Sequence, residues 1–257
     1  MIECDEAMNP EVVLAAKRQA LAARKAKVPI EAIRALASLQ KRPLPVLSTV
    51  TGGVVTTIIG QICRGSAGSA YDPVASALRL LRAGVDTLAL FTDDQVYDRG
   101  LNDFALVARA VSAPLISQDY IFDEYQVVEL RAAGAAGLVL YADLLDPGCL
   151  RALVSATQRN RMTAIVQASS AEQLAQVVPI SPQAVAVAVN GMELPALSQL
   201  RHSIPPHIHV VIAESLLDFD DTNAAARLRP DAVFASPGVL DRADAVERLR
   251  QLLNPAF

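Results

Sequence analysis

The stretch Thr57–Ser69, TIIGQICRGSAGS, decides how the chain is organised. Its apolar half, which contains Ile58 and Ile59, predicts a buried strand, and the stretch then breaks into a loop of small residues from Gly65 onward. Seven further apolar runs follow, each paired with a segment of helical periodicity. If the eight runs close into a barrel, Gln61 and Cys63 point inward at the mouth, where such barrels carry their functional groups.

The strand candidates are near-continuous runs of Val, Ile, Leu and Ala, as expected for parallel strands that are buried on both faces. They cover residues 57–62, 86–91, 114–117, 137–142, 163–167, 184–189, 208–213 and 231–235. Helical patterns alternate with them at 73–83, 102–111, 123–134, 147–160, 170–178, 193–203, 219–229 and 241–253. Several helical patterns end in Gly or small-residue turns, as at Gly84 and Gly134. The alternation predicts an α/β protein with a single (β/α)8 TIM barrel.

Two helical patterns precede the first strand, at residues 10–26 and 30–40. We therefore expect an N-terminal helical extension over residues 1–48, packed on a barrel over residues 49–257. The first of these helices carries Lys and Arg interspersed with Ala, and no second basic cluster accompanies it. We interpret its basic face as a solvated one rather than as a surface for membranes or nucleic acids.

Composition excludes several classes of partner. The chain has 257 residues, a net charge of −4 and no Trp, which gives no electrostatic or stacking argument for nucleic acid. No apolar run is long enough to span a membrane, and the N-terminus is too polar for a signal peptide, so we expect a cytoplasmic protein. The three cysteines, Cys4, Cys63 and Cys149, lack CxxC spacing, and we interpret them as free thiols.

The residues that follow the strands predict a polar mouth that is rich in amides. It has no Lys at these strand ends and no nearby His, so no residue suits a Schiff base. Cys63 is a candidate nucleophile, but a small buried filler is the simpler interpretation. Glu214 is the carboxylate that we expect to point inward on a late strand. The three histidines lie at the opposite end of the barrel without ligand spacing, so we expect no metal site.

Several segments resemble the indole-3-glycerol-phosphate synthase family over nearly the whole length of the chain. They are AAKRQALAARKAKVP at 15–29, Tyr71-Asp72-Pro73, LFTDDQVYDRGLND at 90–103, PLISQDYIFDEYQVVELRAAGA at 114–135, VAVNGMEL at 187–194 and IAES at 212–215. The resemblance implies a barrel enzyme of tryptophan biosynthesis that cyclises, decarboxylates and dehydrates a carboxyphenylamino-deoxyribulose phosphate without a cofactor. It also implies a general-acid lysine on the first strand, a second lysine on the third and an acid–base glutamate on the fifth.

At those positions this sequence departs from the family. The first-strand glutamate and lysine correspond to Gln61 and Cys63, the third-strand lysine to Gln118, and the fifth-strand glutamate to Gln167. The aspartate beside the third-strand lysine is kept as Asp119.

The later strands keep only part of the family's pattern. The sixth-strand asparagine is kept as Asn190, but an arginine becomes Met192. On the seventh strand Glu214 and Ser215 are kept, whereas the glycine after them becomes Leu216. The resemblance also places ligand-binding positions at Ser66, Ser236 and Gly238.

Three hypotheses follow from these substitutions. The leading one is a family barrel without synthase activity, because Gln does not transfer protons near neutral pH; it would bind a small molecule that is phosphorylated or aromatic, or serve as a partner protein or homodimer. The second is an enzyme reassigned to a related aromatic or sugar-phosphate compound, acting through Cys63, Glu214, Asn190 and Asp119. The third is an active synthase that works through the substituted residues.

Overall fold

The computed structural model describes residues 10–47, 55–63, 71–92, 100–187, 194–216, 226–242 and 244–254. Within these ranges, the structure describes residues 10–12, 194–198 and 214–216 by their backbone alone. The expected boundary between the extension and the barrel, at residues 48 and 49, lies outside the described residues.

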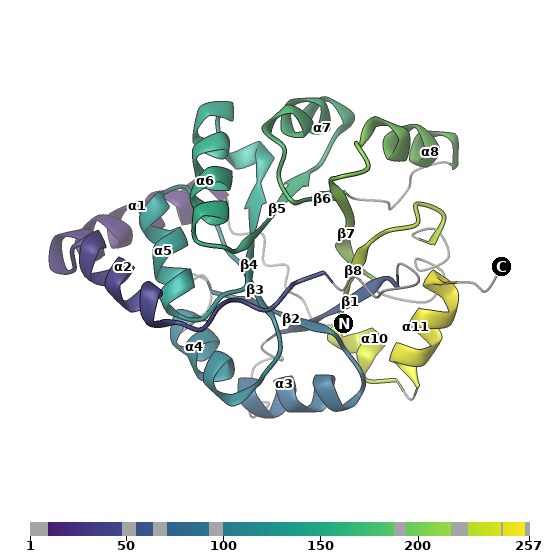
Figure 1. The fold of residues 1–257 in the computed structure, drawn as a ribbon, viewed down its shortest axis with the longest axis horizontal. Helices are drawn as coiled ribbons and strands as arrows, with labels where there is room; N and C mark the ends of the chain where they lie inside the picture. The colour runs from purple at the N-terminus through teal and green to yellow at the C-terminus, as the bar shows by residue number, and fades with distance from the viewer. Residues whose placement is uncertain are drawn as a thin grey trace.

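Eight parallel strands form a closed barrel in sequence order, as the alternation predicted (Figure 1). The strands are β1 (Thr57–Ile62), β2 (Thr87–Phe91), β3 (Leu115–Gln118), β4 (Gly137–Tyr141), β5 (Thr163–Ala168), β6 (Ala184–Val187), β7 (His209–Leu216) and β8 (Ala232–Ala235). The pairing of β1 with β8 closes the barrel, with Thr57 opposite Ala232.

Helices surround the barrel and cover its outer face (Figure 1). The described ones are α1 (Pro10–Lys27), α2 (Ile30–Leu39), α3 (Pro73–Arg82), α4 (Gly100–Ala110), α5 (Glu124–Ala132), α6 (Pro147–Arg159), α7 (Ala171–Val177), α8 (Leu194–Ser203), α10 (Pro237–Leu240) and α11 (Ala245–Leu253). Most of the expected helix at 219–229 lies outside the described residues. The last expected helix, at 241–253, is shorter than predicted: it begins at Ala245 and follows the short α10.

Local sequence signals explain where helices begin and end. Asp72 caps α3, because its Oδ1 accepts hydrogen bonds from the backbone N–H groups of Val74 and Ala75 at 2.9 Å, and the following proline occupies the first helical turn. Gly84 and Gly134, which follow α3 and α5, have φ angles of +94° and +102°. These left-handed conformations favour glycine and confirm the turns predicted there.

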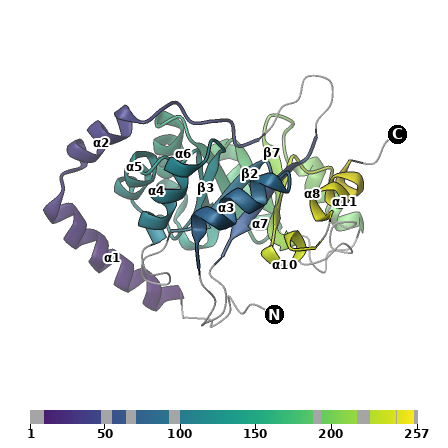
Figure 2. The same cartoon turned by 90° about the horizontal axis from the view of Figure 1, so that it is seen from below.

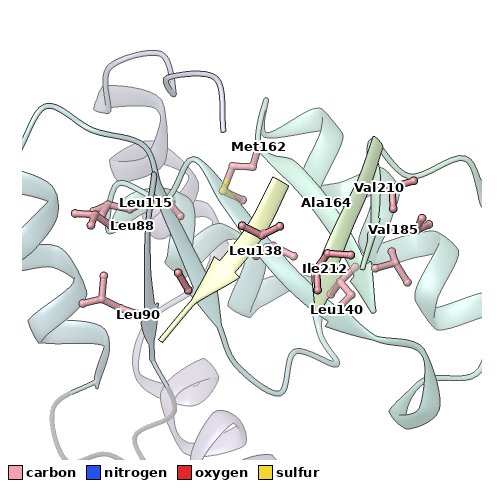
Figure 3. Close-up of a cluster of buried hydrophobic side chains, with 14 of the residues drawn as sticks. Leu88, Leu90, Leu115, Leu138, Leu140, Met162, Ala164, Val185, Val210 and Ile212 are labelled. Carbon is pink, nitrogen blue, oxygen red and sulfur yellow. The ribbon is translucent and has the colours of Figure 1, made fainter. Parts of the chain in front are cut away.

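Side-chain alternation along the strands divides the core into two layers. The inner cluster fills the barrel and includes Ile59, Ile116, Ile165 and Val211. The outer cluster lies between strands and helices, and Figure 3 shows Leu88, Leu115 and Leu138 among its members. Because successive side chains point to opposite faces, each strand contributes to both layers.

The two helices before β1 lie against α5, on one side of the barrel (Figures 1 and 2). Leu21 of α1 and Ile33 of α2 share a buried apolar cluster with Tyr125 and Val128 of α5. The Tyr125 hydroxyl donates a hydrogen bond of 3.0 Å to the carbonyl of Val28, in the turn between α1 and α2. Apolar burial and this polar contact together fix the extension to the barrel.

Gly60, in the middle of β1, lies where the outer layer leaves no room for a side chain. A Cβ there would lie 2.9 Å from Val85 Cγ1 and 3.3 Å from Leu80 Cδ1. We predict that Gly60→Ala lowers the free energy of unfolding by about 1–3 kcal/mol, as measured by denaturant titration. Gly238→Ala is the matched control: its nearest contact would be 3.9 Å away, and we expect no loss of stability. Equal stability of the two variants would contradict this packing.

Candidate functional site

The carboxyl ends of three odd-numbered strands carry the same short pattern, an isoleucine followed two residues later by a glutamine. It occurs as Ile59 and Gln61 on β1, Ile116 and Gln118 on β3, and Ile165 and Gln167 on β5. All three isoleucines belong to the inner cluster, so the glutamines that share their face point into the barrel one layer higher. On β7 the corresponding position, two residues after Val211, is Ala213. Alternate strands build each layer of such a barrel, so three of the four residues in the layer at the mouth are amides.

Two of these amides are paired. Gln61 Nε2 donates a hydrogen bond of 3.1 Å to Gln118 Oε1, and the two residues are only 7% and 6% exposed. Gln167 is half-buried, and its side chain makes no hydrogen bond with any described residue. The described part of this layer therefore offers hydrogen-bond donors and acceptors without a formal charge.

Cys63 follows β1 directly, is partly exposed and forms no disulfide bond with a described residue. Ser236 caps α10 by accepting a hydrogen bond of 3.4 Å from the backbone N–H of Val239, and Gly238 is exposed within that short helix. Three other predicted site residues, Ser66, Asn190 and Met192, lie outside the described residues. The side chains of Glu214, Ser215 and Leu216 lie outside the description as well, although their backbone forms the end of β7. The roles expected for these residues stay predictions.

Asp119 lies one residue beyond Gln118, and its side chain contacts the outer layer. Its Oδ1 forms an ion pair with Lys17 Nζ of α1, and its Oδ2 accepts a hydrogen bond of 3.1 Å from the hydroxyl of Thr92. That hydroxyl lies 2.7 Å from the Ser117 hydroxyl, and Ser117 alternates with the inward-facing residues of β3. Asp119 therefore joins the barrel to the extension.

The expectation that the basic face of the first helix is solvated is wrong for Lys17, whereas Arg24 is partly exposed but paired. Lys17 is only 4% exposed, and Arg24 Nε forms an ion pair of 3.1 Å with Glu129 of α5. Both partners lie more than 100 residues away in the sequence, so local charge spacing gave no sign of these pairs.

An aromatic pair that the sequence analysis missed lies beside the amide layer. Tyr141 is the last residue of β4, shares its face with the inner-cluster Val139 and pairs in register with Gln167. Its ring centroid is 5.7 Å from that of Tyr120, with a tilt of 56° between the planes. The sequence did carry a signal for it: Tyr141 lies two residues after the inward-facing Val139, so strand alternation predicts that its side chain also points inward.

The histidines lie at the other end of the barrel, as expected. His209 begins β7, and its Nδ1 is 3.0 Å from Oδ1 of Asp231, just before β8. The hydrogen bond to Asp231 raises the pKa of His209 above its ordinary value, against the opposing effect of burial. In the part of the chain that the structure describes, no group of three or more His, Cys, Asp or Glu side chains is arranged to hold a metal ion. No helix there is long and apolar enough to cross a membrane.

Comparison with known proteins agrees with this architecture. A family model described as indole-3-glycerol phosphate synthase matches residues 11–233. The indole-3-glycerol phosphate synthase of Mycolicibacterium smegmatis is 26% identical over 248 residues, covering 92% of this chain and 90% of that protein. The enzyme of the same name from Rhodococcus opacus is 24% identical over 253 residues, covering 94% and 93%.

Solved structures show the same fold. The 3-hexulose-6-phosphate synthase of Salmonella typhimurium has a TM-score of 0.61 at 12% identity, with 77% of this chain and 98% of that chain covered. The tryptophan synthase α subunit of Legionella pneumophila has a TM-score of 0.55 at 16% identity, with 78% and 94% covered. At such identities the likeness concerns the fold alone.

Breaking the Lys17–Asp119 pair should destabilise the protein strongly. Removing one partner leaves the other charge buried, so we predict that Lys17→Met lowers the free energy of unfolding by about 3–5 kcal/mol. Lys25→Met, which breaks the more exposed pair with Asp123, should cost no more than about 1 kcal/mol. Denaturant unfolding of both variants and of Lys17→Met/Asp119→Leu measures the difference. A loss from Lys17→Met no larger than that from Lys25→Met would contradict the buried pair.

The His209–Asp231 pair predicts a definite pH dependence. Because the folded-state pKa of His209 is raised, its stabilising contribution is full below the unfolded-state pKa of about 6.5 and is lost as pH rises through the folded value. We therefore expect the stability difference between the wild type and His209→Gln to shrink as pH increases. Thermal unfolding in a series of buffers measures this difference, and His202→Gln, at an exposed position, serves as the control. A stability difference that grows with pH would contradict a raised pKa of His209 in the folded protein.

Proposed function

Because the chain belongs to the indole-3-glycerol phosphate synthase family, we propose that it is a member without synthase activity, whose barrel mouth binds a small molecule by neutral hydrogen bonding. The proposal concerns the chemistry of the mouth rather than the fold. The observation that carries it is the hydrogen bond between the buried amides of Gln61 and Gln118.

The synthase reaction requires proton transfer, and these amides do not supply it. By resemblance, Gln118 and Gln167 stand where the family has a lysine for ring closure and a glutamate for dehydration. An amide neither gives nor takes a proton near neutral pH, whereas each positioned acid or base typically contributes about 10²–10⁴ in rate. Even with strong non-additivity, the loss of several such groups removes most of the catalysis.

The synthase reaction also requires positive charge at the mouth to bind its substrate. The family's substrate carries a carboxylate and a phosphate, and cations at the mouth would attract it. Lys17 is the lysine that contacts the described end of β3, and its ammonium group is bound to Asp119 on the outer side of the strand. It therefore does not replace the cation that the family carries at the position of Gln118.

The mouth instead favours a ligand that is planar and carries hydrogen-bonding groups. Tyr120 and Tyr141 supply apolar ring surface beside the amide layer, and the glutamines supply both donors and acceptors. A small aromatic ligand with few charges fits this combination, and that is the ligand class that we propose.

Assay of the purified protein with the carboxyphenylamino-deoxyribulose phosphate tests the proposal. We expect no indoleglycerol phosphate above the uncatalysed rate from the wild type or from Gln167→Ala. The matched comparison is Cys63→Lys/Gln118→Lys/Gln167→Glu, which restores the family's residues at these positions; turnover that appears only in this variant supports the proposal. Turnover by the wild type that Gln167→Ala abolishes would falsify it.

A further inference from the structure

A pocket of about 550 Å³ lies between the extension and the barrel, away from the mouth. It is formed where the end of α2 and the residues after it meet α5 and the turn that follows α6. Its charged lining consists of five arginines and one carboxylate, Glu124: the arginines are Arg34, Arg42, Arg131, Arg159 and Arg161. These side chains leave a formal charge of +4 in one pocket, whereas the whole chain has a net charge of −4.

The single carboxylate of the lining is already shared. Arg34 of α2 and Arg159 of α6 each place a guanidinium nitrogen 3.3 Å from the same atom, Oε1 of Glu124. Arg42 and Arg161 are exposed and form no ion pair with any described residue. The positive charge of the pocket is therefore largely uncompensated by the described part of the protein.

Arg131 is the buried arginine of the pocket, and backbone carbonyls hold its guanidinium group in place. It is only 7% exposed, and its Nη2 donates hydrogen bonds to the carbonyls of Gln40 at 3.2 Å and Lys41 at 2.5 Å. Burial and the nearby charge of Arg161 lower the pKa of Arg131 below its ordinary value. Arginines that are held close together in this way repel one another, and a bound anion would relieve that repulsion.

We propose that this pocket is a second binding site, for a small molecule that carries two or more phosphate groups. Guanidinium groups bind phosphate through paired hydrogen bonds, and one phosphate, with a charge of about −2, would offset only half of the +4. The volume lies within the range of about 300–1,000 Å³ that is common for small-molecule sites. It is too small for a folded macromolecule.

The site is distinct from the mouth. Arg161 lies two residues before β5, whereas Gln167 lies near the other end of that strand. The pocket also requires the extension, because Gln40 and Lys41 supply the acceptors that hold Arg131. A bound polyphosphate would therefore tie the segment after α2 to the barrel and stabilise the folded chain by mass action.

Calorimetric titration of the full chain with sodium tripolyphosphate at low salt tests the proposal, with the thermal midpoint as a second readout. We expect saturable binding at one site, a raised midpoint, and an affinity that falls by at least about tenfold in Arg42→Gln/Arg161→Asn, equivalent to about 1.4 kcal/mol. Asn is chosen at 161 because that residue has a φ of 59°, which Asn tolerates. Arg109→Gln, at an exposed position on α4, and Gln118→Ala, at the mouth, should bind as the wild type does.

Four results would overturn the assignment. They are no saturable binding, an equal loss of affinity in Arg109→Gln, a loss in Gln118→Ala that the arginine variant does not show, and binding of citrate or of a hexaglutamate peptide as tight as that of tripolyphosphate. The turnover assay of the mouth uses different variants and a different probe, so either proposal can fail while the other holds.

Discussion

The alternation of side chains along the eight parallel strands is the constraint on which the rest of the structure depends. It places Ile59, Ile116 and Ile165 in the inner layer and then, two residues later on the same strands, places three glutamines at the mouth. The same rule sends the neighbouring Ser117 to the outer layer, where it meets Thr92 beside Asp119. On β3, a shift by one residue would exchange the amide of Gln118 for the carboxyl group of Asp119 inside the barrel.

Among the described residues, the paired cations of the extension lie outside the barrel interior. Lys17 and Arg24 of α1 bind acidic partners at the end of β3 and on α5, and the arginines near the end of α2 line a pocket against the barrel. The extension therefore does more than cover apolar surface. It contributes cations where α1 meets β3 and α5, and where α2 and the residues after it line the arginine pocket. Among the described residues, uncharged amides therefore lie inside the barrel, and the cations of the extension lie between the extension and the barrel.

Much of this architecture is readable from the sequence. The Val-, Ile- and Leu-rich runs predicted all eight strands, and the glycines at 84 and 134 predicted the turns that end α3 and α5. The amide character of the mouth was also predictable, because Gln61, Gln118 and Gln167 occupy strand ends.

What the sequence did not reveal depends on contacts between distant segments. The Lys17–Asp119 pair spans 102 residues, and Tyr120 meets Tyr141 only because β3 and β4 are neighbours. The arginine pocket draws on three segments, residues 34–43, 124–131 and 159–161, which only the fold brings together. Periodicity describes one element at a time, so it identifies faces but not the partners that these faces meet.

The central claim is that the amide layer of Gln61, Gln118 and Gln167 holds no group that exchanges protons near neutral pH. Nuclear magnetic resonance of the side-chain amides of Gln61, Gln118 and Gln167, assigned with Gln→Ala variants, tests it most directly across about pH 5 to 9. The account predicts resonances that stay constant through this range. A common titration of these amides with a midpoint inside it would show an ionisable group among them and would contradict the account.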